Sequence, residues 1–197
     1  NLGLYMDRHL TSSDHVNRVV AKCSGVLIAL LHARHSLPKE TIKVIVNALV
    51  ISSVRYCLSI YGTCTKTDLH RIQKVLNFAA RVISGRKKHD HISDVIRDLN
   101  WLTADQLVQY HRTHLVHKVV TTGQPEALYA RIHTNGHHHS HRTRWSDNLR
   151  LPHIRTETGR RQLAYSGVQF YNTVRRIQAE QNVTFRLALL ECLRKET

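Results

Sequence analysis

Hydrophobic residues near the start of the chain repeat every three or four positions, which is the spacing of one face of an α-helix. The run comprises Val16, Val19, Val20, Cys23, Leu27 and Leu30. It predicts a helix that ends near Arg34 and begins after Ser12 or Ser13, because either hydroxyl can cap the first turn. The preceding residues 2–7 have the composition of a short strand.

Two further helices are expected in the first half of the chain. Pro38 suits the first turn of the second helix, and that helix is apolar on most of its faces, so we expect it at the centre of a bundle. Residues 54–61 continue as helix or turn and close at Gly62. The third helix is predicted to begin at Thr67 and to end at Gly85, a residue typical of C-terminal caps. Its apolar face consists of Leu69, Ile72, Leu76, Ala79 and Ile83.

A charged run at 86–91 marks the expected boundary between two domains, residues 1–85 and residues 86–197. In the second domain, Thr103 and Gln106 have the spacing of a capping box and open a helix that stops before Gly123. The other elements expected there are short helices at 93–99 and 125–132, an exposed loop at 133–148, a strand at 149–151, a hairpin joining 155–156 to 162–164, and helices at 168–180 and 184–193. The fold class is therefore mainly α: a helical bundle followed by a smaller helical domain with a short β-hairpin.

The balance of charge indicates a polyanionic partner. Lys and Arg total 29 against 14 Asp and Glu, which gives a net charge of +15, and 16 His add positive charge in acid. Such an excess is typical of proteins that bind nucleic acid, although a solvated basic surface without a partner has the same composition. Basic residues gather in three groups, which we take as candidate nucleic-acid-binding residues: Arg71, Lys74 and Arg81; Arg86, Lys87 and Lys88; and Arg142, Arg144, Trp145, Arg150, Arg155, Arg160 and Arg161. Trp145 can stack on an unpaired base.

The cysteines and the apolar segments bear on the compartment. Cys23, Cys57, Cys64 and Cys192 form no CxxC pair, and no secretory signal is found, so we expect reduced thiols in the nucleus or cytoplasm. The longest apolar stretch, 42–54, is too short and too polar to span a membrane. The chain begins at Asn1 without Met, so we expect it to be a piece of a longer protein or a processed one.

Catalytic and metal-binding candidates are weaker. Asp90, Asp94 and Asp98 have i, i+4, i+8 spacing, and His111, His114 and His117 recur on one predicted helix. Solvated or groove positions explain both sets. Four histidines at 137–141 lie beside Arg142 and Arg144, which repel a divalent cation. The sequence contains neither a GxSxG motif nor a glycine-rich phosphate loop. We therefore assign no catalytic residue, no metal site and no cofactor.

The order of several motifs resembles the C-terminal region of reverse transcriptases from non-LTR retrotransposons of the jockey and CR1 type. The most specific stretch runs from Leu69 to Gly85 and contains His70-Arg71-Ile72-Gln73, Asn77 and Ala79-Ala80-Arg81. Other matching stretches are Leu2-Gly3-Leu4-Tyr5-Met6-Asp7 with His15-Val16, Tyr56-Cys57 to Tyr61-Gly62, Leu99-Asn100-Trp101-Leu102, Pro125 to Leu128, Leu151-Pro152 with Arg155-Thr156 and Gly159-Arg160-Arg161, and Phe185-Arg186 to Leu193. The chain departs at Tyr171-Asn172, where many relatives carry Trp-Asn.

This resemblance implies a strand from the end of the palm and a helical thumb over residues 1–85, followed by a helical nucleic-acid-binding domain. It implies a role in gripping template RNA or an RNA–DNA hybrid during target-primed reverse transcription, alongside an upstream polymerase domain if the chain is part of a longer one. The paired aspartates of the polymerase motif are absent, so the chain alone is expected to be inactive. Two rivals stay open: a recruited structural or assembly protein with protein partners, and a metal-dependent nuclease that uses the His and Asp residues.

Overall fold

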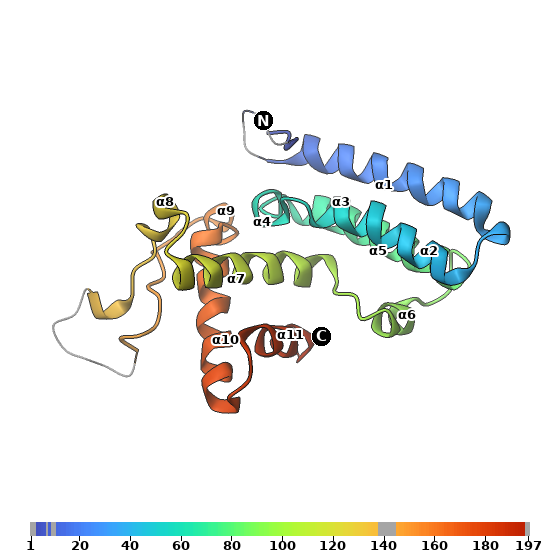
Figure 1. Ribbon diagram of the computed structural model, residues 1–197. Coiled ribbons are helices and arrows are strands. Elements are labelled where there is room, and N and C mark those ends of the chain that lie inside the picture. Colours follow the sequence, from blue (N-terminus) through green and yellow to red (C-terminus); the bar gives the residue numbers. More distant parts are fainter. Residues whose placement is uncertain (1–2, 7, 9–10, 138–144, 196–197) are drawn as a thin grey trace. The chain divides into compact units, whose positions relative to one another are not determined.

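A computed structural model describes residues 3–6, 8, 11–137 and 145–195. The chain divides into two compact units, Asn1–Leu107 and Val108–Thr197, and in their described parts both are built mainly from helices (Figure 1). The sequence-based division at the charged run after residue 85 stays a prediction. The first unit contains α1 (Ser13–Ala33), η1 (Arg34–Ser36), α2 (Lys39–Ile45), η2 (Val46–Ile51), α3 (Ser52–Arg55), α4 (Leu58–Tyr61), α5 (Lys66–Ser84), α6 (Ser93–Asp98) and the start of α7 (Ala104–Thr122). The second contains the rest of α7, α8 (Glu126–Tyr129), η3 (Asn135–His137), α9 (Glu157–Arg160), η4 (Leu163–Gly167), α10 (Val168–Gln181) and α11 (Phe185–Lys195).

The core of the first unit lies between α1 and α5, and both helices bury the apolar faces that their periodicity predicts. The buried residues of α1 include Val16, Cys23 and Leu27, and those of α5 include Ile72, Leu76, Ala79 and Ile83. Hydrophobic burial on this scale is the main favourable term in folding. The two helices are also joined by a polar contact, in which the Ser13 hydroxyl donates to Asp68 Oδ2 at 2.8 Å.

The helix starts differ from the prediction. Ser12 precedes α1 in a left-handed conformation with φ 61° and makes no side-chain capping bond. Thr65 caps α5, because its hydroxyl oxygen accepts from the Asp68 N–H at 3.2 Å, so this helix begins at Lys66, one residue earlier than expected. The predicted end is confirmed: Gly85 has φ 81°, and its N–H donates to the Arg81 carbonyl. The capping box of Thr103 and Gln106 is also confirmed, with reciprocal bonds of 2.9 and 3.3 Å.

The second predicted helix is not central. It runs through α2, η2 and α3, where η2 is a π-helical turn, and only one side is buried, by Ile42, Val46, Val50 and Val54. The opposite side exposes apolar residues, with Val44 65% and Leu49 49% exposed. Apolar residues on most faces indicated burial on all sides, and within the described structure that expectation is wrong.

After α3 the chain turns sharply and buries Tyr61. Cys57 has φ 55°, which permits the turn between α3 and α4. Tyr61 is fully buried, its hydroxyl donates to the Val54 carbonyl, and its ring meets His15 edge-on at 4.7 Å between centroids. Burial raises the pKa of Tyr61 well above its ordinary value. Gly62 follows α4, as predicted.

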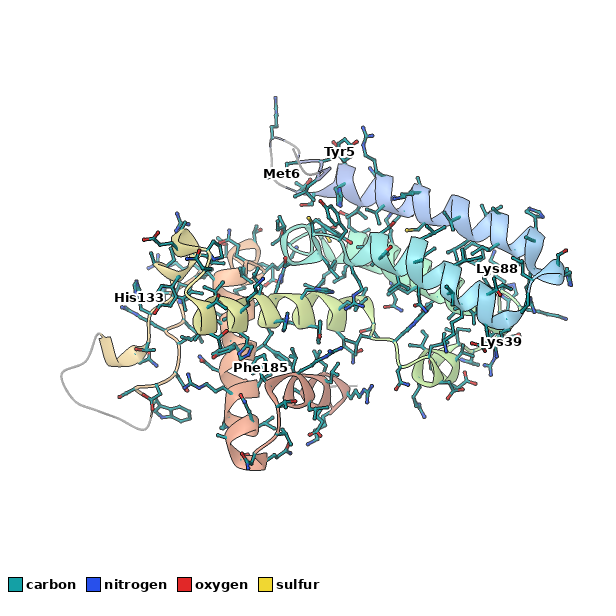
Figure 2. All side chains as sticks on the ribbon, in the orientation of Figure 1. Tyr5, Met6, Lys39, Lys88, His133 and Phe185 are labelled. Atoms are coloured by element: carbon teal, nitrogen blue, oxygen red, sulfur yellow. The ribbon has the colours of Figure 1, made fainter. Side chains whose placement is uncertain are left out.

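The second unit packs α10 against α11, and the side of α7 within this unit contributes Val116 and Val119 to its buried residues. Phe185 at the start of α11 (labelled in Figure 2) stacks on His117 of α7 at 3.8 Å between centroids. Other buried residues are Val168, Tyr171, Val174, Ala188, Leu189 and Leu193. The predicted helices near 168–180 and 184–193 are thereby confirmed.

The three predicted β elements are not supported in the described part of the chain. Residues 3–6 form no strand. The segment expected to form a hairpin instead holds α9, capped by the Thr156 side chain, and the π-helical turn η4. Gly159 lies within α9 rather than at a hairpin turn. Near Leu149 a single antiparallel bridge to Thr134 is found.

One stretch of the described chain, Ser13–Ser36, has the length and the apolar character of a helix that crosses a membrane. Core helices of bundles pass the same test. In this structure α1 packs its buried face on α5.

Candidate nucleic-acid interface

The first basic group lies on α5, and two of its three residues are engaged within the protein. Arg71 is paired with Asp68 at 3.2 Å. Arg81 donates from Nε to the Lys87 carbonyl at 3.3 Å and from Nη2 to the Asp90 carbonyl at 3.2 Å. Lys74 is exposed, and its ammonium group has no partner among the described residues. Arg81 therefore stabilises the loop that follows the helix, and Lys74 is the member of this group best placed to meet a ligand.

The second basic group forms that loop. Arg86 makes a two-pronged ion pair with Asp94, with Nη1 2.8 Å from Oδ1, and also donates to the His91 carbonyl. The hydrogen bond from Arg86 lowers the pKa of Asp94, so this carboxylate keeps its charge to lower pH than a free aspartate does. The Lys87 N–H donates to Asp90 Oδ2 at 2.8 Å, which turns the chain and leaves the Lys87 and Lys88 side chains exposed.

Arg34 joins this loop, although the sequence groups did not include it. A Cβ atom added at Gly85 would lie 1.8 Å from Arg34 Nη2, so the guanidinium rests directly on the backbone that ends α5. The Lys39 and Lys88 side chains lie at this same end of the first unit (Figure 2). We call Arg34, His35, Lys39, Lys87 and Lys88 the basic end. Glu40 is an acidic neighbour in the first turn of α2.

The alternating direction of the helices explains the basic end. Figure 1 shows α1 and α5 ending at the same side of the unit, where α2 begins. Each helix C-terminus carries a partial negative charge that favours nearby cations. The signal was present in the sequence, because an up-down-up bundle brings the ends of its first and third helices together.

Most of the described members of the third basic group are exposed to solvent. Arg142 and Arg144 lie outside the described residues. Trp145 is 47% exposed, and Arg150, Arg155 and Arg160 are exposed as well. Arg161 is half-buried and paired with Glu157 at 3.5 Å.

A cavity of about 520 Å³ lies within the second unit, and Arg150 is the member of the third group that lines it. Its floor is apolar, formed by Val116, Leu128 and Leu163 among others, and its polar lining is Arg131, His133, Arg150, His153 and Gln162. Arg131, His133 and His153 were not among the sequence candidates. Their spacing along the chain gave no periodic signal, because the cavity forms only when residues near 131, 152 and 163 fold together.

The alternative chemistries find no support in the described residues. They contain no group of three or more His, Cys, Asp or Glu side chains positioned to hold a metal ion. Asp94 is committed to Arg86, and His117 stacks on Phe185. The four cysteines are free thiols, and burial raises the pKa of Cys23 to about 11, which opposes a nucleophilic role.

No protein-family model matches this sequence, and no curated protein or solved structure matches it significantly.

Proposed function

We propose that this chain is a nucleic-acid-binding module that holds RNA or an RNA–DNA hybrid by its phosphates, as the C-terminal portion of a non-LTR reverse transcriptase would. The observation that carries the proposal is the basic end. Arg34 and Lys39 come from one segment of the chain and Lys87 and Lys88 from another, and all four lie at one end of the first unit. The net charge of +15 supports the same partner class.

The geometry favours backbone contacts over base reading. Lys87 and Lys88 are exposed on a loop that Arg81, Arg86 and Asp90 hold in place. Point charges on long side chains suit phosphates, and phosphate contacts fix position without reading sequence. The proposal therefore predicts binding that depends strongly on salt and weakly on sequence. The exposed Trp145 adds a surface on which an unpaired base can stack.

Polymerisation itself is not assigned to this chain. No catalytic residue and no cofactor are proposed for it, and in this proposal the reaction belongs to an upstream polymerase domain. The chain's contribution is to hold the template or the hybrid duplex beside that domain.

The test is fluorescence anisotropy with labelled single-stranded RNA, duplex DNA and RNA–DNA hybrid, each over a salt series. Replacing Lys87 and Lys88 by Gln should weaken binding and reduce the slope of log K against log salt by about 2, one for each lost phosphate contact. The matched control replaces the exposed Lys66 and Lys118 by Gln, which removes the same net charge elsewhere. Absence of binding at low salt, or an equal loss in both double variants, would overturn the proposal.

A specific observation also favours the second candidate, a structural or assembly protein. Val44, Leu49 and Ile60 of α2, η2 and α4 are each about half exposed or more. Several large apolar side chains exposed to solvent are typical of proteins that bind a protein partner. In this reading, a purified partner should lose affinity for a Leu49→Glu variant and bind the Lys87→Gln, Lys88→Gln variant normally. The nucleic-acid reading predicts that Leu49→Glu binds RNA normally.

A further inference from the structure

A second cavity, of about 590 Å³, lies in the first unit at the start of α1. Among its lining residues are His15, Arg18 and Lys22 of α1, Tyr5 of the preceding segment, Ser53 of α3, and Tyr56, which directly follows α3. Figure 1 shows that α1 begins at the end of the unit opposite the η1 turn, so this cavity is separate from the basic end. Tyr5, labelled in Figure 2, lies beside the first turns of α1.

His15 lines this cavity and holds a buried donor. The residue is only 4% exposed, and its Nδ1 accepts a hydrogen bond from the Tyr5 N–H at 3.4 Å. In a neutral imidazole whose Nδ1 accepts, the proton is on Nε2. Nε2 is buried and has no hydrogen-bond partner among the described residues. Buried donors without an acceptor are rare in folded proteins, and each one calls for an explanation.

The surroundings of His15 are positively charged. Arg18 and Lys22 follow it at i+3 and i+7, so all three side chains share one face of α1. The Arg18 guanidinium lies over the Tyr5 ring at 3.9 Å, and among the described residues neither cation has an ion pair with a carboxylate. The His15 ring is held from its other side by Tyr61, so its donor has a fixed direction. An acceptor that binds beside these groups is therefore expected to be anionic.

The shape of the cavity indicates what carries that anion. A volume of about 590 Å³ exceeds the needs of an inorganic phosphate and falls within the usual range for small-molecule sites. Tyr56 is 49% exposed and gives the cavity an aromatic wall on which a planar ring can pack. Ser52 and Ser53 donate to the carbonyls of Ala48 and Leu49, which leaves their hydroxyl oxygens available only as acceptors.

We propose that this cavity binds the phosphate group of a nucleotide, with His15 Nε2–H as the buried donor, Arg18 and Lys22 as the cations, and Tyr56 packed against the base. The site is independent of the function proposed above, because it shares no residue with the basic end. The phosphate is supplied either by a free mononucleotide or by the end of a strand, and the two sources are distinguished by experiment.

The experiment is calorimetric titration of the whole chain with AMP and with adenosine, together with ¹⁵N spectra of the histidine rings. Saturable AMP binding, at least ten-fold tighter than that of adenosine and accompanied by a shift of the His15 Nε2 resonance, is expected. The exposed Arg18 and Lys22 are replaced together by Gln, and AMP affinity should fall ten-fold or more. The control variant Lys87→Gln, Lys88→Gln should bind AMP with the affinity of the original chain and bind the hybrid duplex more weakly. The nucleotide site and the proposed nucleic-acid-binding function are therefore tested independently.

Equal affinity for AMP and adenosine, or an Arg18→Gln, Lys22→Gln variant that binds AMP as tightly as the original chain, would overturn the proposal. A second arm compares AMP with a hexanucleotide carrying a 5′-phosphate and with the same hexanucleotide lacking it. Tighter binding of the phosphorylated strand than of AMP assigns the site to a strand end. Tighter binding of AMP assigns it to a free nucleotide.

Discussion

The side chain of Asn172 binds both polar groups of the Leu149 backbone. Its Oδ1 accepts from the Leu149 N–H at 3.0 Å, and its Nδ2 donates to the Leu149 carbonyl at 2.8 Å. Leu149 is 3% exposed, so these groups have little access to water. The amide of Asn172 thus satisfies the N–H and the carbonyl that a neighbouring β-strand would otherwise pair with, and it attaches the segment that follows Trp145 to α10.

Replacing Asn172 by Ala should destabilise the second unit by about 2 kcal/mol, because it leaves a buried donor and a buried acceptor without partners. Asn172→Asp tests the geometry, since a carboxylate accepts from Leu149 N–H but repels its carbonyl. It should therefore also destabilise. Urea unfolding followed by circular dichroism measures both, with the neighbouring exposed Thr173→Ala as control. Variants as stable as the original chain would show that the two hydrogen bonds between Asn172 and Leu149 do not stabilise the second unit.

Gly85→Ala should destabilise the first unit for two separable reasons. A left-handed residue with a Cβ costs about 1–2 kcal/mol, and here the Cβ would also collide with the Arg34 guanidinium. Removing Arg34 beforehand should reduce the cost to the backbone contribution alone. The measurement is a double-mutant cycle of Gly85→Ala and Arg34→Ala in urea. Strictly additive effects would contradict the contact between the two residues.

Asp94→Asn should increase affinity for RNA. Asp94 is ionised at neutral pH, like any aspartate of ordinary or lowered pKa, and its ion pair with Arg86 competes with phosphates for that guanidinium. Releasing Arg86 adds a cation to the loop, and the slope of log K against log salt should steepen by about 1. Asp98→Asn, which removes the same charge from an exposed residue four positions on, is the matched control. If both variants gain equally, net charge alone explains the effect.

His117 should make the stability of the second unit depend on pH. Burial lowers the pKa of His117, and the charge of His114 lowers it further. As the pH falls below about 6.5, the unfolded chain binds a proton at this position before the folded chain does. The free energy of unfolding is therefore unaffected by the protonation of His117 above about pH 6.5, and it decreases as the pH falls from there to the pKa of the folded state. His117→Phe should flatten the dependence of the unfolding free energy between pH 5 and about 7. Burial also lowers the pKa of His15, which adds a pH dependence of the same sign. Because His15 is present in both the original chain and the His117→Phe variant, its contribution cancels when their pH dependences are subtracted. Identical slopes in the two proteins would rule out this role for His117.

Local signals predicted the helices well because they act within a few residues. The periodicity from Val16 to Leu30, the Gly85 cap and the Thr103–Gln106 capping box all reappear in the structure. The failed predictions depended on distant partners. The hairpin at 155–164 needed a pairing strand, but Thr156 caps a helix there instead. Likewise, nothing local showed that Val44 and Leu49 stay exposed.

The candidate interface shows the same division. Runs such as Arg86-Lys87-Lys88 were visible in the sequence, but the sequence could not show which cations are already engaged. Arg81 and Arg86 are committed to carbonyls and to Asp94, whereas Arg34 and Lys39 join the site from another segment. The donor of His15 was hidden for a different reason, since an orphaned atom is recognised only after its neighbours are placed.

The π-helical turn η2 keeps the buried residues of this helical segment on one side. The buried residues Ile42, Val46, Val50 and Val54 are spaced by four, and each such step overshoots an α-helical turn by about 40°. Three steps would carry the apolar line about a third of the way around a regular helix. Because a π turn takes more residues per revolution, it winds this line back toward the core. A single-residue deletion within η2 would shorten one of these steps to three residues, and a 4-3-4 spacing keeps the apolar line within about 40° of the core on a regular α-helix. The π turn therefore accommodates one extra residue while Ser53 and Tyr56 still line the cavity beside His15.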